Sequence, residues 1–149
     1  MGSEMCIRDR YLHNSRTASK FKAELTGNAG WISPKPWNII IIPGDSTLDE
    51  MFSEIKRGIY VGNVWYTRYQ NYREGLFSTI CRDAILYIEN GEVKGSLTNF
   101  RISDNMLRIL NNIKLIGKEV YSVKWWDAPI PTYTPHIMVS DVNFTTAVK

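Results

Sequence analysis

Cysteine and histidine are scarce in this sequence, which has two of each among its 149 residues. A structural zinc site needs about four ligands from His, Cys or carboxylate side chains, and a catalytic one about three. Neither His13 nor His136 is followed by the Glu and second His that would place two imidazoles on one helix face. The sequence therefore predicts no metal site and no complete catalytic site within this chain.

Disulfide bonds are excluded as well. Cys6 lies in a terminal segment that is set aside below, which leaves Cys81 alone, and a single cysteine forms no internal disulfide. Proteins of the cytoplasm keep their thiols reduced. This cysteine usage predicts a cytoplasmic location.

Long apolar runs and basic blocks are also missing. The longest apolar run, Trp37–Pro43, is far shorter than the roughly 18 residues that a membrane-spanning helix needs. The 18 Lys and Arg exceed the 15 Asp and Glu by a net charge of +3, and they are spread along the chain. Nucleic-acid-binding domains gather their basic residues on one face or in one stretch. We therefore expect neither a membrane span nor nucleic-acid binding.

The first ten residues need separate treatment. Residues 1–10, MGSEMCIRDR, match the in-frame translation of a common transposase sequencing adapter, and no apolar segment follows their charges as in a signal peptide. We exclude them from fold reasoning and expect the natural chain to begin upstream of Tyr11. Residues 11–36 are polar and interrupted by glycine and proline, which predicts an irregular, loop-rich segment.

Residues 37–149 carry the patterns of a folded domain. Trp37–Ile42 is a continuous, mostly β-branched run, typical of a strand that is buried on both faces. Asp45 or Ser46 is suited to begin a helix, which Gly58 ends. Aromatic and β-branched residues indicate further strands at 59–69, 75–88, 120–126 and 136–142.

The connections between these strands indicate the fold class. Asn90-Gly91 lies between two apolar runs and predicts a hairpin, because a type I′ turn requires positive φ at both positions. A second amphipathic helix is predicted from Ser103 to Gly117. A proline-rich loop at 129–135 is expected between the last two strands. Since hairpins outnumber strand–helix crossovers, we predict an α+β fold: a mainly antiparallel β sheet or partly closed barrel with two amphipathic helices.

Four residues are candidates for substrate binding. Arg82 and Asp83 interrupt an apolar strand pattern, which indicates either a bulge or strand end facing a cleft, or a solvated turn. Trp125 and Trp126 either line a peptide groove or pack in the core, where aromatic residues are common. The same two interpretations apply to Tyr60, Tyr66, Tyr69 and Tyr72.

Cys81 and His136 are weaker candidates. A nucleophilic cysteine needs a basic partner that lowers its thiol pKa. Cys81 instead ends the apolar run Phe77–Cys81, which favours a buried structural thiol. His136 has no companion ligand and is interpreted as a loop or strand-edge residue.

Four short stretches follow one another in a specific order and spacing. They are Gly27–Gly30 with Pro36–Asn38 and Pro43–Gly44; Arg57–Val61 with Trp65–Tyr66; Arg82–Asp83 running into Ile88–Val93 and Asn99–Arg101; and Val139–Thr145. Together they resemble the C-terminal domain of the TldD/PmbA family, also called TldD/TldE. The likeness extends from about Thr26 to the end of the chain.

The resemblance implies that residues 37–149 form a largely β C-terminal domain of a longer cytoplasmic protein. Members resemble metallopeptidases or their paired partners and act on peptides or partly unfolded polypeptides. The metal-binding member of a pair uses a His-Glu-x-x-x-His helix upstream of this region and a cysteine near its C-terminus. This chain has no such helix and no cysteine after Cys81, so no catalytic residue of the family is assigned to it.

The resemblance also implies partners and cofactors. We expect a missing N-terminal domain, a homodimer or heterodimer partner, and a peptide substrate, with no cofactor in this chain and zinc allowed in the full-length parent. Whether the parent is an enzyme or the metal-free member of a pair is left open. The alternative is a non-catalytic scaffold domain that binds a peptide or a partner through aromatic residues such as Trp125 and Trp126.

Overall fold

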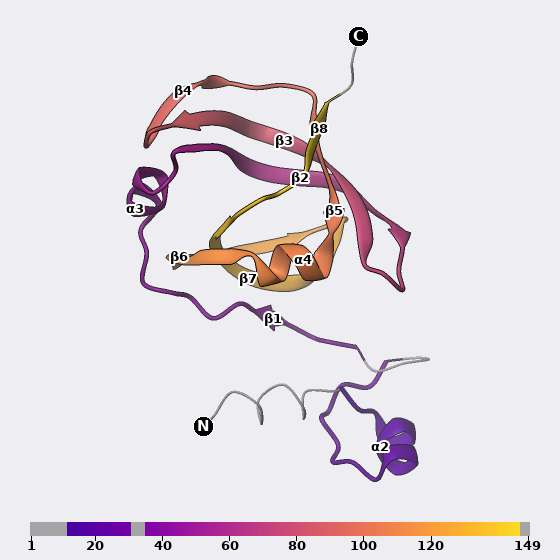
Figure 1. Ribbon diagram of the computed structural model, residues 1–149. Helices are drawn as coiled ribbons and strands as arrows, with labels where there is room; N and C mark the ends of the chain where they lie inside the picture. The colour runs from indigo at the N-terminus through magenta and orange to yellow at the C-terminus, as the bar shows by residue number, and fades with distance from the viewer. Residues whose placement is uncertain (1–11, 31–34, 147–149) are drawn as a thin grey trace.

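Two β-sheets form the body of the molecule in the computed structural model, which describes residues 12–30 and 35–146 (Figure 1). One sheet has the order β1-β7-β6, and the other has the order β2-β3-β5-β8 with β4 also paired to β3. The strands are β1 (Ile39–Ile40), β2 (Arg57–Asn71), β3 (Leu76–Glu89), β4 (Glu92–Ser96), β5 (Phe100–Asn105), β6 (Ile113–Trp125), β7 (Ala128–Val139) and β8 (Phe144–Thr146). The helices are α2 (Ser15–Phe21), α3 (Leu48–Ser53) and α4 (Met106–Asn111).

The sheets remain separate, and neither closes on itself. All strand pairs except the parallel pair β1–β7 are antiparallel, so the predicted mainly antiparallel α+β fold is confirmed. The partly closed barrel is wrong, because a barrel requires its first and last strands to pair, whereas β2 and β8 lie at opposite ends of one sheet. None of the described helices has the length and apolar character that a membrane crossing needs.

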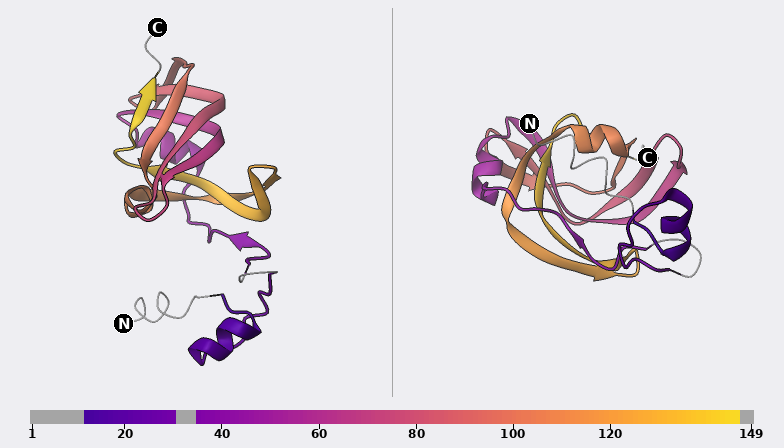
Figure 2. Two further views of the ribbon diagram at one scale, coloured as in Figure 1. Left: turned by 90° about the vertical axis from the view of Figure 1, so that its right-hand side faces the viewer. Right: turned by 90° about the horizontal axis from the view of Figure 1, so that it is seen from below.

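The N-terminal segment extends away from the two sheets and carries α2 (Figure 2). The Asn14 side chain accepts a hydrogen bond from the Thr17 amide at 2.9 Å, and the Thr17 hydroxyl accepts one from the Asn14 amide at 3.0 Å. We expected little regular structure here and missed this helix, because its reciprocal cap lacks the usual Glu or Gln. Residues 1–10, which we attributed to an adapter, lie outside the described residues.

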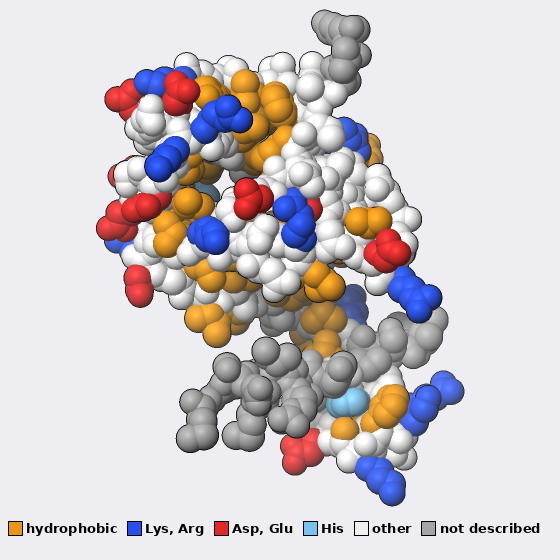
Figure 3. Space-filling view, viewed as in Figure 1, with side chains coloured by type: hydrophobic (Ala, Val, Ile, Leu, Met, Phe, Trp, Pro, Cys, Tyr) orange, Lys and Arg blue, Asp and Glu red, His pale blue; other side chains and the backbone are white. Residues whose placement is uncertain are grey.

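The run Trp37–Ile42 is neither a long strand nor buried. Only Ile39 and Ile40 pair, with Thr132 and Tyr133 of β7. Most side chains of this run remain exposed, with Ile40 67% and Ile42 80% accessible, and Ile41 is half-buried. Nothing in the described part of the chain covers them, so the predicted burial on both faces is wrong for this chain. Figure 3 shows apolar side chains on the face from which the N-terminal segment extends.

A bulge interrupts the pairing of β2 with β3, as one interpretation of the Arg82-Asp83 pair required. Val61 pairs with Ile85, but Asn63 pairs with Arg82, so β3 has one extra residue between these positions. Asp83 has a φ of 61°, the left-handed conformation that is common in bulges and tolerated by Asp. The bulge is confirmed in preference to the solvated turn.

The hairpin at Asn90-Gly91 is confirmed. The two residues have φ angles of 49° and 79°, and they connect β3 to β4 through the pair Glu89–Glu92. Both turn amides also donate outside the hairpin, to the carbonyl oxygens of Lys56 and Ile55 at 2.9 Å each. The turn thereby holds the segment between α3 and β2 against the five-stranded sheet.

Both helices predicted after residue 37 exist but are shorter than expected. Thr47, rather than Asp45 or Ser46, caps α3. Asn105 caps α4, and Asn112 ends it by donating its side-chain amide to the Ser140 carbonyl at 3.3 Å. Ile113 and Ile116, which lie inside the predicted helix range, therefore belong to β6, where β-branched residues pack well.

The prolines at positions 129, 131 and 135 lie within β7, not in a loop, so that prediction is wrong. The Ile41 amide donates to the Tyr133 carbonyl at 2.9 Å, so the Tyr133 backbone faces β1. Pro131 and Pro135 lie two residues away on either side and face the same way. Because these two prolines do not face β6, their missing N–H groups remove no hydrogen bond between β6 and β7. Proline is tolerated in a strand at such positions.

The buried core is small. It contains Phe77, Cys81, Ile85 and Ile88 of β3 and Met51 of α3, together with Ala18 of α2. Cys81 is only 3% exposed, which confirms the expectation of a buried thiol.

Candidate functional site

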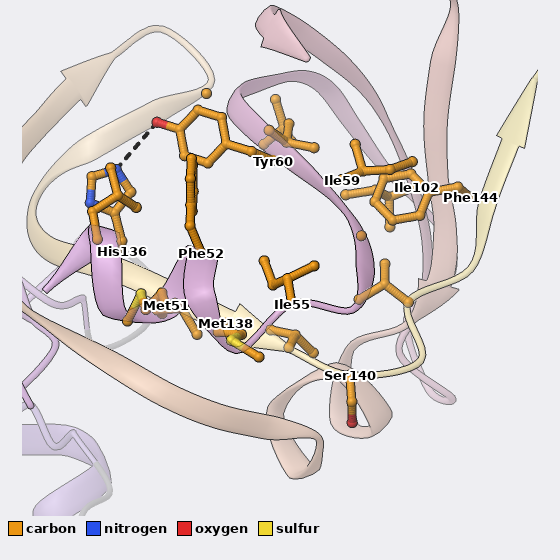
Figure 4. A pocket seen from close by; sticks show the side chains of 18 of the residues that line it. Met51, Phe52, Ile55, Ile59, Tyr60, Ile102, His136, Met138, Ser140 and Phe144 are labelled. Atoms are coloured by element: carbon orange, nitrogen blue, oxygen red, sulfur yellow. Dashed lines mark hydrogen bonds between the residues drawn. The ribbon is translucent and has the colours of Figure 1, made fainter. Parts of the chain in front are cut away.

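A wide cavity of about 1990 Å³ lies between the two sheets, and Figure 4 shows its lining. Small-molecule pockets have volumes of roughly 300–1,000 Å³, so this cavity is large enough for a polypeptide segment. Its walls come mainly from α3, β2 and β7, with further residues from β5, β6 and β8. They are mostly apolar, and Met51, Phe52, Met138 and Phe144 are among them.

Tyr60 and His136 form the main polar contact across this cavity. The Tyr60 hydroxyl lies 3.3 Å from His136 Nε2, as the dashed line in Figure 4 shows. The rings of Phe52 and Tyr121 pack against Tyr60 and His136, with centroids 5.5 and 4.9 Å apart. His136 therefore lies within β7, not in a loop, where a phenol and aromatic neighbours hold it.

The ligands for a metal ion are missing from the part of the chain that the structure describes. No group of three His, Cys, Asp or Glu side chains comes together there. Since a zinc ion needs three or four such ligands, the described residues do not fit a zinc site. This finding concerns residues 12–30 and 35–146 only.

An aromatic cluster lies next to the cavity, at the tip of the β6–β7 hairpin. Trp65 of β2 is at its centre, with ring centroids 6.3 Å from Trp125 and 5.9 Å from Trp126. The Arg82 guanidinium carbon lies 4.5 Å from the centroid of the Trp65 ring, a cation–π contact. Arg82, Trp125 and Trp126, three of the four predicted site residues, therefore all contact Trp65. The name aromatic cluster is used below for Trp65, Tyr66, Trp125 and Trp126.

Asp83, the fourth predicted residue, faces a different partner. Its carboxylate accepts a hydrogen bond from the Asn63 side-chain amide at 2.9 Å. The bulge separates it from the aromatic rings, and both Arg82 and Asp83 are exposed. Asp83 therefore positions the β2–β3 bulge rather than touching the cluster.

Asp127 fixes the hairpin tip against β2. Its carboxylate accepts a hydrogen bond from the Thr67 amide at 3.1 Å and lies 3.5 Å from the Arg68 guanidinium. Tyr66, between Trp65 and Thr67, has a φ of 55°. A non-glycine residue in this conformation is strained and persists only where its surroundings hold it, often at functional sites.

Trp65 and Asp127 were not predicted as site residues. Trp65 lies in an aromatic strand whose residues suit a sheet equally well, so composition alone did not distinguish it. The contact of Arg82 with Trp65 depends on the register of β2 with β3, which the local sequence does not give.

Cys81 does not form a nucleophilic site. Burial raises the pKa of its thiol above the ordinary value, although a backbone hydrogen bond from Ile102 and the charge of Arg101 act in the opposite direction. His136 Nε2 contacts Tyr60 instead. The predicted buried, inert thiol fits this environment better than a reactive one.

Known proteins similar to this chain support the family resemblance. Over 118 residues, 76% of this chain, it is 33% identical to a protein named metalloprotease from Methanocaldococcus jannaschii, covering 26% of that protein. Over 100 residues, 63% of this chain, it is 33% identical to a zinc metalloprotease TldD homolog from Saccharolobus solfataricus, covering 22% of it. The chain thus spans about a quarter of the length of these relatives.

Solved structures show the same fold. TldE from Thermococcus kodakarensis matches 90% of this chain with a TM-score of 0.76 and 26% identity, over 30% of its own length. A proposed modulator of a DNA gyrase from Thermotoga maritima matches 91% with a TM-score of 0.78 and 29% identity, also over 30% of its length. Residues 8–146 match the pattern of the PmbA/TldA metallopeptidase C-terminal domain, and the chain belongs to that family.

Proposed function

We propose that this chain is the C-terminal domain of a longer TldD/PmbA-type protein, in which it forms a non-catalytic wall that binds peptides or unfolded polypeptides. The relatives named metalloprotease support proteolysis as the activity of the full-length parent or of its pair. In this proposal Arg82, Trp125 and Trp126 contact the polypeptide. Asp83 keeps Arg82 in place through the bulge.

One observation carries the proposal: an exposed aromatic cluster lies beside the large cavity, on strands that also line it. Val64 of β2 and Val123 of β6 line the cavity, and Trp65 and Trp125 lie one and two residues beyond them along the same strands. Trp126 is 55% exposed and Tyr66 43%. Exposed Trp and Tyr beside an arginine are the residue types that contribute most to protein and peptide binding.

The catalytic metal belongs elsewhere in this proposal. The described residues hold no set of three metal ligands, so zinc would be held by the rest of the parent or by the other member of a pair. The exposed run Trp37–Ile42 supports a covering element, either the missing N-terminal domain or a dimer partner. We propose the cytoplasm as the location of the assembly.

The test uses the full-length parent, purified alone and with the paired protein encoded in the same genome. Binding of an unfolded polypeptide and its hydrolysis are measured separately, with and without a chelator. We expect Trp126→Ala to weaken binding and to leave the zinc content unchanged. A Trp126→Ala protein that binds as well as the unaltered parent contradicts the proposal. Tyr72→Ala is the control, because Tyr72 is 83% exposed and lies outside the aromatic cluster.

A non-catalytic scaffold domain is the second candidate. It is favoured by the same exposed aromatic cluster, which would hold a partner subunit instead of a substrate. Stoichiometric zinc together with chelator-sensitive cleavage by the parent or its pair rejects this alternative. Partner binding that depends on Trp126, without any cleavage, supports it.

A further inference from the structure

A row of four side chains crosses three strands of the larger sheet. Trp65 pairs with Ile80, and Ile80 pairs in turn with Arg101. Directly paired residues have their side chains on one face, and Arg82, two residues beyond Ile80, shares that face. We refer to Trp65, Ile80, Arg82 and Arg101 as the outer row.

The outer row faces away from the cavity at β5. Ile102 lines the cavity, and successive side chains of a strand point to opposite faces. Arg101 therefore points to the other face of the sheet. On β8 the same alternation applies, since Phe144 lines the cavity and Thr145, which pairs with Arg101, does not.

Both arginines of the outer row lack a carboxylate within the described part of the chain. Salt bridges there involve Arg68, Lys94 and Arg108. Arg82 stacks on Trp65, and Arg101 donates through Nε and Nη2 to the Ser78 hydroxyl at 3.2 and 2.9 Å. A neutral hydroxyl leaves the guanidinium charge uncompensated, while its planar fork suits a carboxylate.

Further hydrogen-bonding groups surround Arg101 and Trp65. The Ser103 hydroxyl lies 3.4 Å from Ser78 Oγ and 3.5 Å from the Thr145 hydroxyl. The buried indole N–H of Trp65 has no acceptor in the structure, and an unpaired buried donor is costly. The row thus combines two cations, hydroxyls and an unused donor, all of which suit a ligand with oxygen acceptors.

We propose that the outer row binds an acidic, extended polypeptide segment. Arg82 and Arg101 are diagonal neighbours, a relation that separates positions by about 7–8 Å. Alternate residues of an extended chain are about 7 Å apart, so two carboxylates at alternate positions match the spacing of the two arginine positions on the sheet. This inference rests on the proposed function and names the substrate class: polypeptides whose acidic residues alternate with neutral ones.

Charge complementarity favours a polypeptide over nucleic acid. A phosphate backbone is bound through a continuous series of cations, about 6–10 in well-studied proteins, whereas the outer row has two.

The experiment measures binding to the full-length parent by fluorescence anisotropy. Two labelled synthetic peptides of equal length are compared, one with Glu and one with Gln at alternate positions. We expect the Glu peptide to bind about fivefold more tightly for each arginine that it engages, the upper range for an exposed ion pair. Raising the salt concentration should remove this preference, because ions screen exposed charges.

Substitutions of single arginines test which side chains cause the preference for the Glu peptide. Arg82→Gln and Arg101→Lys should each reduce the preference for Glu, whereas Arg73→Gln, which removes an exposed arginine from the β2–β3 turn, should not. Circular dichroism of each variant checks that the fold is retained, and Arg101→Lys keeps the charge while losing the planar fork. Equal binding of the Glu and Gln peptides overturns this inference and leaves the proposed function standing. If neither peptide binds, both this inference and the proposed function are contradicted. If single-stranded oligothymidine binds more tightly than the Glu peptide, the inference is overturned in favour of nucleic acid.

Discussion

Tyr60 of β2 and His136 of β7 join the two sheets through a hydrogen bond of 3.3 Å between the phenol and Nε2. Removing the hydroxyl in Tyr60→Phe should lower the free energy of unfolding by about 0.5–1.5 kcal/mol, the usual net value of one hydrogen bond. Tyr72→Phe is the control, since Tyr72 is 83% exposed. Urea unfolding of both variants checks this, and equal values for the two would show that the contact does not stabilise the pairing of the sheets.

The Asn90-Gly91 turn should tolerate no side chain at its second position. Gly91 has a φ of 79°, and an added Cβ would lie 3.2 Å from the Cα of Ser53. We expect Gly91→Ala to destabilise the chain by about 1–3 kcal/mol through backbone strain. Gly95→Ala is a matched control, because no atom lies within 4 Å of its added Cβ. Thermal unfolding that is unchanged in both variants would contradict the strained turn.

Asp104 should make the stability of the folded chain depend on pH in the acidic range. Burial alone would raise the pKa of its carboxyl, but hydrogen bonds from Arg108 and from the amides of Asn143 and Asn105 outweigh burial and lower it. Between the folded and unfolded pKa values the unfolded chain binds more protons, so stability rises with pH. The contribution of Asp104 is therefore fully present above its unfolded pKa of about 3.9 and is lost as the pH falls through the lower folded value.

This dependence is checked by unfolding the chain in urea at pH values from neutral to acidic. At neutral pH we expect Asp104→Asn to cost about 1.5–3 kcal/mol, the range for hydrogen bonds to a charged group. The difference from the unaltered chain should shrink on acidification. Asp45→Asn, at an exposed position, serves as control. A difference that is constant at every pH would refute the assigned role of the carboxylate.

Residues 12–149 alone should associate in solution. Ile40 and Ile42 are 67% and 80% exposed, and exposed apolar surface beside a two-residue strand promotes aggregation. The double variant Ile40→Ser, Ile42→Ser should shift sedimentation toward the monomer, whereas Leu107→Ser, at a 64% exposed position on α4, should not. If the unaltered chain is a monomer with one cooperative unfolding transition, no covering element is missing.

Local signals predicted much of the fold. Asn90-Gly91 defined its hairpin because the turn type depends on two adjacent residues, and the Arg82-Asp83 pair indicated the bulge that the register shows. The second helix was predicted too long because Ile113 and Ile116 fit both a helical stripe and a strand, and their pairing with β7 places them in β6. The prolines of β7 were misplaced because only the backbone direction at Tyr133 shows that their missing N–H groups are harmless.

The candidate site was predicted only in part. Arg82, Trp125 and Trp126 were selected from unusual local composition, and the structure brings them together. Trp65, which connects them, was missed because its position depends on the register of β2 with β3 and on the contact with the β6–β7 tip. Such long-range contacts cannot be predicted from the local sequence.

We predict that this chain binds polypeptide but does not cleave it. The most direct measurement compares residues 12–149 with the full-length parent and its pair, using one unfolded polypeptide with zinc present. We predict binding by all of them, cleavage only by the parent or the pair, and loss of cleavage, but not of binding, on adding a chelator. Zinc-dependent cleavage by residues 12–149 alone, or the absence of cleavage from both the parent and the pair, would contradict this account.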